Sequence, residues 1–276
     1  MMIDENTKII GRFHTKQSGR GLNIYNPFFE EVGVNAIYVL FYNEDPRSLI
    51  DGFKNLNLFS AITAGFESND ELPKLLDEVG DEAKYLGKIG YIKNENGKLV
   101  GHAQGGEGMY KTLLQVTNID NTNIAIVGAG NIAKGLIYCI NKNNHKCSVD
   151  IYNRNIDNAN SLKDKFSFVE NVYELNKFGD KKYDVLLNLT DLGGSEEDNL
   201  FNEQNVSTFD SVVDVTFEKE NTNLVDIAKK LNKKYATGWD MFTNQGLVIL
   251  KDLFDKDFEF NIFKKHVVNG LSSVVK

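Results

Sequence analysis

A short glycine-containing segment carries the clearest chemistry in the sequence. It follows Asn123–Val127, a continuous apolar run that is typical of a buried strand, and it precedes Ile132–Asn141, whose apolar spacing predicts a helix. The segment reads Gly128-Ala129-Gly130-Asn131-Ile132-Ala133. Gly128 permits a tight turn, Gly130 permits close approach of a pyrophosphate, and Ala133 permits close helix–strand packing. Because backbone N–H groups at a helix start bind phosphate, this segment predicts a dinucleotide site, with a ligand-free glycine turn as the alternative.

The end of the next expected strand, Ser148–Tyr152, bears on which dinucleotide binds. NAD-selective sites usually place an acidic side chain there, where it accepts a hydrogen bond from the ribose. Here Asn153 and Arg154 follow the strand, and Asp150 comes too early within it. Arg154 could bind an adenosine 2′-phosphate, which favours NADP over NAD. A solvated loop charge is the alternative interpretation.

The composition is that of a folded protein large enough for two domains. The chain has 276 residues, of which 41% are hydrophobic and 25% charged. The longest apolar run, Ala36–Tyr42, has seven residues, whereas a membrane span needs about 20, so we expect no membrane contact. A net charge of −8 disfavours nucleic acid as a partner. Cys139 and Cys147 form no metal or redox motif, and no apolar signal segment begins the chain, which predicts a cytoplasmic location.

The first part of the chain alternates strand-like and helix-like segments. Strands are expected at Lys8–Ile10, Ala36–Tyr42, Phe59–Thr63, Ile89–Lys93 and Lys98–Val100, and helices at Tyr25–Val32, Pro46–Leu56, Leu72–Leu76 and Ala83–Leu86. The last two strands could pair across the turn at Asn94–Gly97. This order predicts an α/β domain with a largely parallel sheet.

The pattern repeats after Asn121. Strands are expected at Asn123–Val127, Ser148–Tyr152, Asp184–Leu189, Ser211–Val215 and Lys234–Ala236, and helices at Ile132–Asn141 and Asn158–Phe166. A strand, a glycine turn, a helix and a second strand begin a doubly wound dinucleotide-binding (Rossmann) fold. Two further helical patterns, Asn244–Phe254 and Phe260–Val268, follow the last strand and are expected to return to the first domain. The expected domains are residues 1–109 with 241–276, and residues 110–240.

In their order and spacing these motifs resemble the shikimate dehydrogenase family over most of the chain. The matching segments include the glycine turn, Asn153-Arg154-Asn155 (family N-R-T), Asn188-Leu189-Thr190 (N-A-T), Asp214 with Phe217 and Thr222 (D-x-x-Y…T), and Gly238, Met241, Gln245 and Gly246 (G-x-x-M-x-x-x-Q-G). The resemblance implies an α/β substrate-binding domain, a Rossmann NADP-binding domain, C-terminal helices that return to the first domain, and oxidoreductase activity. It extends the cofactor contacts from the glycine turn to Asn153, Arg154, Thr190, Gly238 and Met241.

The same resemblance shows where the family's catalytic pair is missing. The lysine of N-V-T-x-P-H-K corresponds to Glu67, and the aspartate of N-T-D-G-x-G corresponds to Gly105. A positioned acid or base is typically worth 10²–10⁴-fold in rate, so ordinary shikimate oxidation is hard to derive from this sequence. The catalytic residues stay unassigned. Glu67 and His102 are candidate replacements, with an ordinary loop carboxylate and a surface histidine as the alternatives.

Most of the family's substrate contacts are also absent. Its substrate-holding asparagine corresponds to Gly90, and its two serines fall within residues 19–22, where no serine pair occurs. Thr63 and Gln245 match. The expected loop at residues 11–21 contains Arg12 and Arg20 and no acidic residue, which predicts an anionic small-molecule ligand other than shikimate. A solvated cationic loop is the alternative.

Two functions therefore stay open from the sequence. One is an NADP-dependent oxidoreductase of this family with changed catalytic or substrate groups, acting as a monomer or homodimer. The other is a pseudoenzyme that binds NADP as a sensor or scaffold without hydride transfer. A substrate pocket filled by Phe66, Tyr91 or Trp239 would favour the second. His145 and His266 are isolated in the sequence and are expected to be surface residues.

Overall fold

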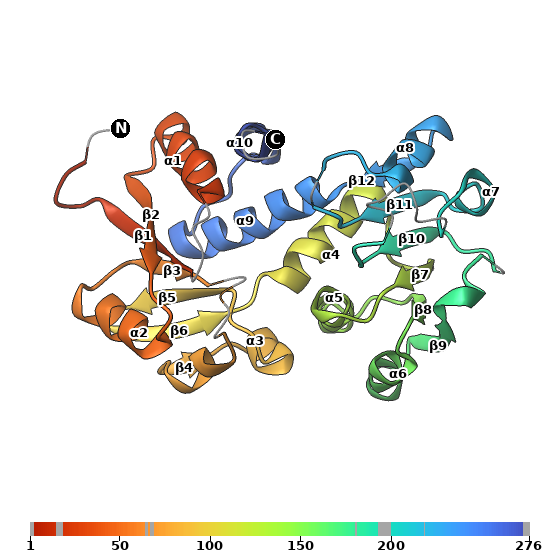
Figure 1. Ribbon diagram of the computed structural model, residues 1–276, viewed down its shortest axis with the longest axis horizontal. Helices are drawn as coiled ribbons and strands as arrows, with labels where there is room; N and C mark the ends of the chain where they lie inside the picture. The colour runs from red at the N-terminus through yellow and green to blue at the C-terminus, as the bar shows by residue number, and fades with distance from the viewer. Residues whose placement is uncertain are drawn as a thin grey trace. The chain divides into compact units, whose positions relative to one another are not determined.

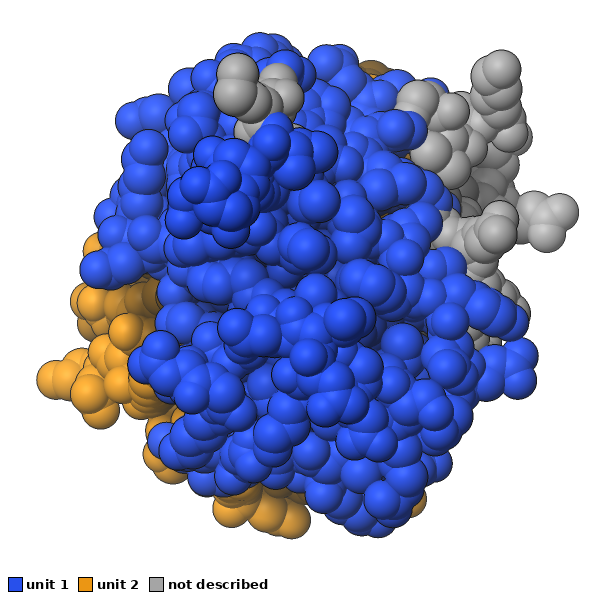
Figure 2. Space-filling view, turned by 90° about the vertical axis from the view of Figure 1, so that its left-hand side faces the viewer, with its two compact units in different colours: residues 1–104, 246–276 blue, residues 105–245 orange. Residues whose placement is uncertain are grey.

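The chain divides into two compact units, and their boundaries along the sequence differ by a few residues from the expected ones. The computed structural model describes residues 3–14, 19–63, 66, 69–179, 181–192, 200–217 and 219–272. The first unit comprises residues 1–104 and 246–276, and the second comprises residues 105–245 (Figure 2). The expected boundaries were 109/110 and 240/241. They differ because helix α4 (Gly105–Val116) packs mainly against α5, β11 and β12 of the second unit, and because helix α9 (Gly238–Phe254) continues through the second boundary.

The first unit is built on a six-stranded mixed sheet (Figure 1). Its strand order is β2-β1-β3-β5-β6-β4. The strands are β1 (Lys8–His14), β2 (Ala36–Tyr42), β3 (Ser60–Ile62), β4 (Glu78–Val79), β5 (Tyr91–Glu95) and β6 (Lys98–His102). Strand β1 pairs in parallel with β2 and β3, whereas β5 is antiparallel to β3 and β6. The expected β5–β6 hairpin is confirmed, and its turn places Asn96 and Gly97 at positive φ.

Helices of this unit include segments from both ends of the chain. They are α1 (Arg20–Val32), α2 (Pro46–Asn55), the 3₁₀ helix η1 (Asn69–Lys74), α3 (Asp81–Leu86), the end of α9 and α10 (Phe260–Ser272). Helix α10 lies beside α1, where the ring centroids of Phe28 and Phe263 are 4.7 Å apart (Figure 1). The expectation that the C-terminal helices return to the first part of the chain is thereby confirmed.

Two elements near the N-terminus differ from the expected ones. Strand β1 continues to His14, so Arg12 lies in the sheet and not in a loop. Parallel pairing with β2 over the whole of β1 satisfies its backbone groups, which local sequence does not reveal. Helix α1 begins at Arg20, before the predicted Tyr25, and its first residues carry no side-chain cap that would have marked the start.

The second unit contains a six-stranded, wholly parallel sheet. Its order is β12-β11-β10-β7-β8-β9. The strands are β7 (Asn123–Val127), β8 (Ser148–Asn153), β9 (Val169–Glu174), β10 (Val185–Asn188), β11 (Ser211–Asp214) and β12 (Lys234–Ala236). The helical segments are α4, α5 (Asn131–Lys142), α6 (Ile156–Lys165), η2 (Leu175–Lys177), α7 (Glu203–Val206), α8 (Asn223–Lys230) and the start of α9. This strand order is that of the doubly wound Rossmann fold, which confirms the predicted fold class.

Each unit has an apolar core of its own. One cluster in the first unit includes Phe13, Phe53 and Ile92, and one in the second includes Tyr152 and Phe209. The buried Cys139 lies on α5, as expected for an apolar filler. Among the described residues, no helix is long and apolar enough to cross a membrane.

Candidate functional site

The glycine turn between β7 and α5 has the geometry that its sequence predicts. Gly128 has a φ of +105°, a conformation that L side chains rarely adopt. A Cβ atom on Gly128 would lie 2.7 Å from the Thr190 side chain and 2.9 Å from the Leu189 carbonyl oxygen. The Gly128 N–H donates to the carbonyl of Tyr152, which ties the turn to β8. Only glycine therefore fits this position without strain.

The N-terminus of α5 forms an open cradle for phosphate. Gly130 is the N-cap residue, and a Cβ added there would meet nothing within 4 Å. The first turn of α5 carries no acidic residue, so its N–H groups and helix dipole favour an anion. Ala133 is fully buried, Ala129 is 4% exposed, and Asn131 and Ile132 begin the helix. These residues fit the pyrophosphate of a dinucleotide.

The carboxylate of Asp150 is engaged away from the strand end. Asp150 is 7% exposed and accepts hydrogen bonds from Tyr183 Oη at 2.8 Å and from Asn171 Nδ2 at 2.9 Å. Burial raises the pKa of Tyr183, and the hydrogen bonds with Tyr152 and Asp150 add to this shift. Asp150 therefore serves the interior of the second unit and is not placed to accept from a ribose.

The end of β8 presents a cation instead of an acid. Asn153 is half-buried, and its Nδ2 donates to the carbonyl of Asn155 at 2.7 Å. Arg154 is exposed. A guanidinium at this position can pair with a 2′-phosphate, because its planar donors match phosphate oxygens in two places.

A buried network centred on Asp214 holds the loops that follow β10 and β11. Asp214 is fully buried and accepts from Thr222 Oγ1 at 2.6 Å, Asn188 Nδ2 at 3.1 Å and the Thr216 N–H at 3.0 Å. Asn188 in turn accepts from Thr190 Oγ1 at 2.7 Å. Burial raises the pKa of Asp214, although each of these donors lowers it. The network fixes Thr190, which lies against Gly128.

The start of α9 packs closely on the end of this loop region. A Cβ atom on Gly238 would lie 2.3 Å from the Thr216 carbonyl oxygen, so a side chain would force the backbone to move. Trp239 is 5% exposed, and its Nε1 donates to the Phe217 carbonyl at 3.1 Å. Met241 is 7% exposed. Trp239 is thus held inside the second unit as a packed and hydrogen-bonded residue.

In the first unit, the sheet places Arg12 and Thr63 at one edge. Arg12 pairs in register with Ile62, the last residue of β3, and Thr63 follows directly. Thr63 is fully buried, and its Oγ1 donates to the Ile89 carbonyl at 2.8 Å. Arg12 is half-buried, and its charge acts on Tyr38, whose pKa burial raises to about 12. Arg12 has no carboxylate partner among the described residues.

Arg20 and Gln245 are not part of the sheet edge that carries Arg12 and Thr63. Arg20 is the exposed first residue of α1. Gln245 is half-buried on α9 and belongs to the second unit, where a Cβ on Gly108 would lie 2.4 Å from its Cγ. The structure therefore brings Arg12 and Thr63 to one sheet edge within the first unit, while Gln245 is placed by its contact with α4.

Neighbouring side chains occupy the space beside Gly21 and Gly90, two glycines in regions where the family resemblance predicts that substrate contacts are absent. At Gly21, a Cβ would lie 2.5 Å from Cε1 and 2.6 Å from Oη of Tyr38. At Gly90, a Cβ would lie 1.5 Å from Oε1 of Gln104. A serine at position 21 or an asparagine at position 90 would therefore require Tyr38 or Gln104 to move.

Of the two positions that the family resemblance predicts for a catalytic pair, the structure describes only Gly105. Glu67 lies outside the described residues. Gly105 begins α4 without a side chain, and a Cβ there would meet only Ile132 Cδ1, at 3.5 Å. His102 is half-buried and stacks on Tyr91, with ring centroids 5.1 Å apart. Burial lowers the pKa of His102, and its Nε2 has no hydrogen-bond partner in the described part of the chain.

The prediction that His145 and His266 are surface residues is wrong for His266, which is buried, whereas His145 is partly exposed. The side chain of His145 is 16% exposed, and its ring lies 2.7 Å from Tyr110 Oη and 3.1 Å from Asp120. His266 is 7% exposed, and its Nε2 lies 2.8 Å from Glu31 on α1. Both histidines join segments far apart in the sequence. That is why their isolation in the sequence gave no sign of their burial.

Phe66 and Tyr91, two of the aromatic residues that could fill a substrate pocket, pack within the first unit. Phe66 is 3% exposed and belongs to the apolar core of the first unit. Tyr91 is 3% exposed, and its Oη donates to Asp252 on α9 at 3.0 Å. Lys93 adds a bond to the same carboxylate at 3.1 Å. Sequence reasoning missed this Tyr91–Lys93–Asp252 cluster because Asp252 is far away along the chain.

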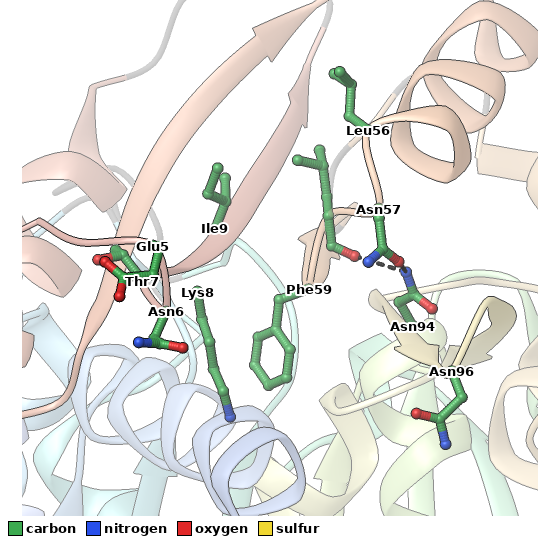
Figure 3. Close-up of a pocket in the computed structure, with 11 residues that line it drawn as sticks. Glu5, Asn6, Thr7, Lys8, Ile9, Leu56, Asn57, Phe59, Asn94 and Asn96 are labelled. Atoms are coloured by element: carbon green, nitrogen blue, oxygen red, sulfur yellow. Dashed lines mark hydrogen bonds between the residues drawn. The ribbon is translucent and has the colours of Figure 1, made fainter.

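A separate cavity of about 310 Å³ opens in the first unit, where β1 and β3 begin (Figure 3). Lys8 Nζ lies 4.2 Å from the centroid of the Phe59 ring. Asn94 Nδ2 donates to Asn57 Oδ1 at 3.0 Å, as the dashed line in Figure 3 marks. The cavity therefore lies at the sheet edge opposite to Thr63, and no residue predicted to bind substrate or cofactor lines it.

The fold and the phosphate-binding turn define the second unit as a dinucleotide-binding domain. No protein-family model matches the sequence. The chain is 30% identical over 247 residues to the shikimate dehydrogenase (NADP⁺) of Pyrococcus furiosus, covering 89% of each chain. It is also 30% identical over 256 residues to that of Aquifex aeolicus, covering 91% of this chain and 92% of the relative.

Solved structures agree with these relatives. A crystal structure of a shikimate dehydrogenase in complex with NADP⁺ has a TM-score of 0.80 and 26% identity, and the match covers 97% of each chain. A shikimate 5-dehydrogenase-like protein of 19% identity shares the fold, with a TM-score of 0.85 over 98% of this chain and 99% of the other. The chain belongs to the shikimate dehydrogenase family.

Proposed function

We propose that this protein is an NADP-dependent oxidoreductase whose substrate is a small anionic, hydroxylated molecule other than shikimate. The observation that carries the proposal is the contrast between its two sites. The cofactor turn keeps the glycines, the open helix end and the cation that a dinucleotide phosphate requires. At the substrate positions, Tyr38 and Gln104 fill the space beside Gly21 and Gly90.

The proposed cofactor contacts come from the second unit. The N–H groups at the start of α5 would bind the pyrophosphate, Gly130 would allow its close approach, and Arg154 would pair with the 2′-phosphate. The fixed positions of Thr190 and Gly238 support the loops beside this turn. When bound, NADP supplies or accepts the hydride. The relatives are named as NADP⁺ enzymes, which agrees with the choice of cofactor.

The proposed substrate contacts come from the first unit. Arg12 lies near the C-terminal end of β1, where it is half-buried and has no carboxylate partner among the described residues. Arg20 follows β1 in the sequence and is an exposed cation at the start of α1. A guanidinium binds a carboxylate through two parallel hydrogen bonds, so these residues support an anionic ligand. The proton that leaves a substrate hydroxyl is assigned to no residue.

A pseudoenzyme that binds NADP without hydride transfer is the second candidate. Gly105 favours it, because that position carries no carboxylate to orient a base. The two candidates share the cofactor site and differ only in catalysis. They are separated by whether any hydroxylated carboxylate is oxidised.

An absorbance assay tests the proposal directly. We expect NADPH to bind, as measured by its fluorescence, and we expect no increase at the NADPH absorbance band with NADP⁺ and shikimate or quinate. The shikimate dehydrogenase of Pyrococcus furiosus serves as the positive control. Reduction of NADP⁺ by another hydroxylated carboxylate would support the oxidoreductase, and failure of a broad set with NADPH binding intact would favour the pseudoenzyme. Turnover of shikimate would contradict the proposed change of substrate.

Cofactor selectivity gives a second test. Replacing Arg154 by alanine should weaken NADPH binding by about 10-fold and leave NADH binding unchanged, because one charge-assisted phosphate contact is lost. Arg47→Ala is the matched control, since Arg47 is an exposed arginine in the first unit. Fluorescence titrations with both cofactors measure the effect. Equal weakening of NADPH binding and NADH binding would show that Arg154 does not contact the 2′-phosphate.

A further inference from the structure

Gln104 places an unpartnered amide in a nearly buried position of the first unit. Its residue is 7% exposed, and its side chain has no hydrogen-bond or ionic partner among the described residues. Other buried amides are paired: Asn188 donates to Asp214, and Asn244 donates to Thr112 Oγ1 at 2.9 Å. Buried polar groups in folded proteins are almost always hydrogen-bonded. The Gln104 amide is not among the fully enclosed unpaired atoms, so it keeps contact with solvent and is accessible to a ligand without breaking a bond to the described chain.

The missing side chain at Gly90 makes the space for this amide. All three atoms nearest to a Cβ built on Gly90 belong to Gln104: Oε1 at 1.5 Å, Cδ at 2.5 Å and Nε2 at 3.0 Å. A side chain at position 90 and the observed position of the Gln104 side chain thus exclude one another sterically. The backbone of Gly90 is not in the positive-φ region, so the conformation does not demand glycine. The space beside it is what requires glycine here.

The backbone places this pair at the substrate edge of the sheet. The Gly90 carbonyl accepts from the Thr63 N–H at 2.9 Å, and the Gly90 N–H donates to the His102 carbonyl at 2.7 Å. Gly90 is therefore held between the residue that follows β3 and the last residue of β6. Gln104 comes two residues after β6 ends. The amide thus lies beside Gly90, whose carbonyl is bonded to Thr63, and Thr63 follows the end of β3 with which Arg12 is paired.

We propose that Gln104 is a specificity-determining residue whose amide binds a hydroxyl group of the substrate. An amide offers one acceptor and two donors, so it can both give a hydrogen bond to a hydroxyl group and receive one from it. A site that hydrogen-bonds a substrate hydroxyl also rejects analogues that lack it. The inference rests on the proposed function, because it takes this sheet edge to be the substrate side.

The first experiment uses the free protein. Gln104→Met keeps the length of the side chain and removes the amide. Because the amide has no partner in the chain, the variant should unfold at the same temperature as the original protein or at a higher one. Gln115→Met, at an exposed position on α4, is the matched control. A clear fall in the unfolding temperature for Gln104→Met alone would show a structural hydrogen bond and overturn the proposal.

The second experiment tests ligand binding with defined probes. The probes are shikimate, quinate, gluconate and glycerate, with cyclohexanecarboxylate as the hydroxyl-free analogue. The Gln104 side-chain N–H₂ signals, assigned by their loss in Gln104→Met, should shift in NMR spectra with at least one hydroxylated probe and not with cyclohexanecarboxylate. Gln104→Met should weaken binding of that probe by about 10-fold and reduce its preference over the analogue. No shift with any hydroxylated probe up to its solubility limit would overturn the proposal.

A substitution at Gly90 provides an independent variant. Gly90→Ala should displace the Gln104 amide, since only the end of a flexible side chain must move. It should therefore weaken binding of the same probe. Unchanged binding in Gly90→Ala would contradict the proposed contact. The NADPH titration separates this inference from the proposed function. If NADPH binds but no probe shifts the Gln104 signals, the proposed contact between Gln104 and the substrate is rejected and the proposed function stands. If a probe shifts the Gln104 signals but NADPH does not bind, the proposed dehydrogenase function is rejected and the Gln104 contact stands.

Discussion

Gly130→Val should weaken NADPH binding on the order of 100-fold, about 2.7 kcal/mol, while the protein remains folded. A Cβ atom at Gly130 meets nothing within 4 Å, so the substitution creates no clash in the free chain. The loss of unfolding free energy should stay at about 1 kcal/mol or less, the usual cost of a poorer N-cap residue. The valine methyl groups would occupy the space through which a pyrophosphate approaches the N–H groups of α5.

Gly128→Val provides the contrast for this experiment. Its φ of +105° and the 2.9 Å approach of the Leu189 carbonyl oxygen mean that valine there should destabilise the fold itself. Chemical denaturation and NADPH fluorescence titration should therefore separate the two glycines. Tight NADPH binding by Gly130→Val would exclude the α5 end as the phosphate site and with it the proposed cofactor site.

Asp214→Ala should lower the free energy of unfolding by about 3–5 kcal/mol, a cost typical of breaking a buried charged network. The substitution would remove the buried acceptor of Thr222 Oγ1 and of the Thr216 N–H, and one of the two acceptors of Asn188 Nδ2, which also donates to the Leu192 carbonyl. Because Asn188 also holds Thr190 against the cofactor turn, NADPH binding should weaken in parallel. Urea denaturation followed by circular dichroism measures the loss.

The matched control is Asp214→Asn, which keeps the shape and one acceptor oxygen. Burial raises the pKa of Asp214, so the folded state binds its proton more tightly than the unfolded chain does. The stability contributed by this group is therefore complete below the unfolded pKa of about 3.9 and is lost as pH rises through the folded pKa. Asp214→Asn should accordingly lower the free energy of unfolding by less at pH 7 than at pH 4. A cost for Asp214→Ala within about 0.5 kcal/mol would mean that the network contributes no more than an ordinary surface site.

The cofactor turn could be predicted from sequence because its determinants are local. The apolar run of β7, the spaced glycines and the periodic apolar residues of α5 occupy one continuous segment, and each constrains the backbone near itself. The same holds for the β5–β6 hairpin, whose Asn96-Gly97 turn favours positive φ at both residues. Strand β9 was missed because its pairing with β8 is not visible in its own segment. Helix α4 was missed because its first turn contains Gly105, Gly106 and Gly108, which are poor helix formers.

The surroundings of Gly21 and Gly90 depend on contacts that no local pattern reveals. The family resemblance predicts a lost asparagine at Gly90 and the absence of a serine pair within residues 19–22. The structure shows that Tyr38 and Gln104 occupy the adjoining space. Likewise, Arg12 was expected in a loop, and pairing of β1 with β2 and β3 places it in the sheet.

By itself the sequence determined the Rossmann unit, its phosphate turn, the family and the absence of an aspartate at position 105. The tertiary structure decided which side chains lie beside Gly21 and Gly90, where the units divide, and that His266 is buried against Glu31. The physical reason is the range of the interactions. Backbone turns and amphipathic periodicity act over a few residues, whereas burial and side-chain complementarity join segments that only folding brings together.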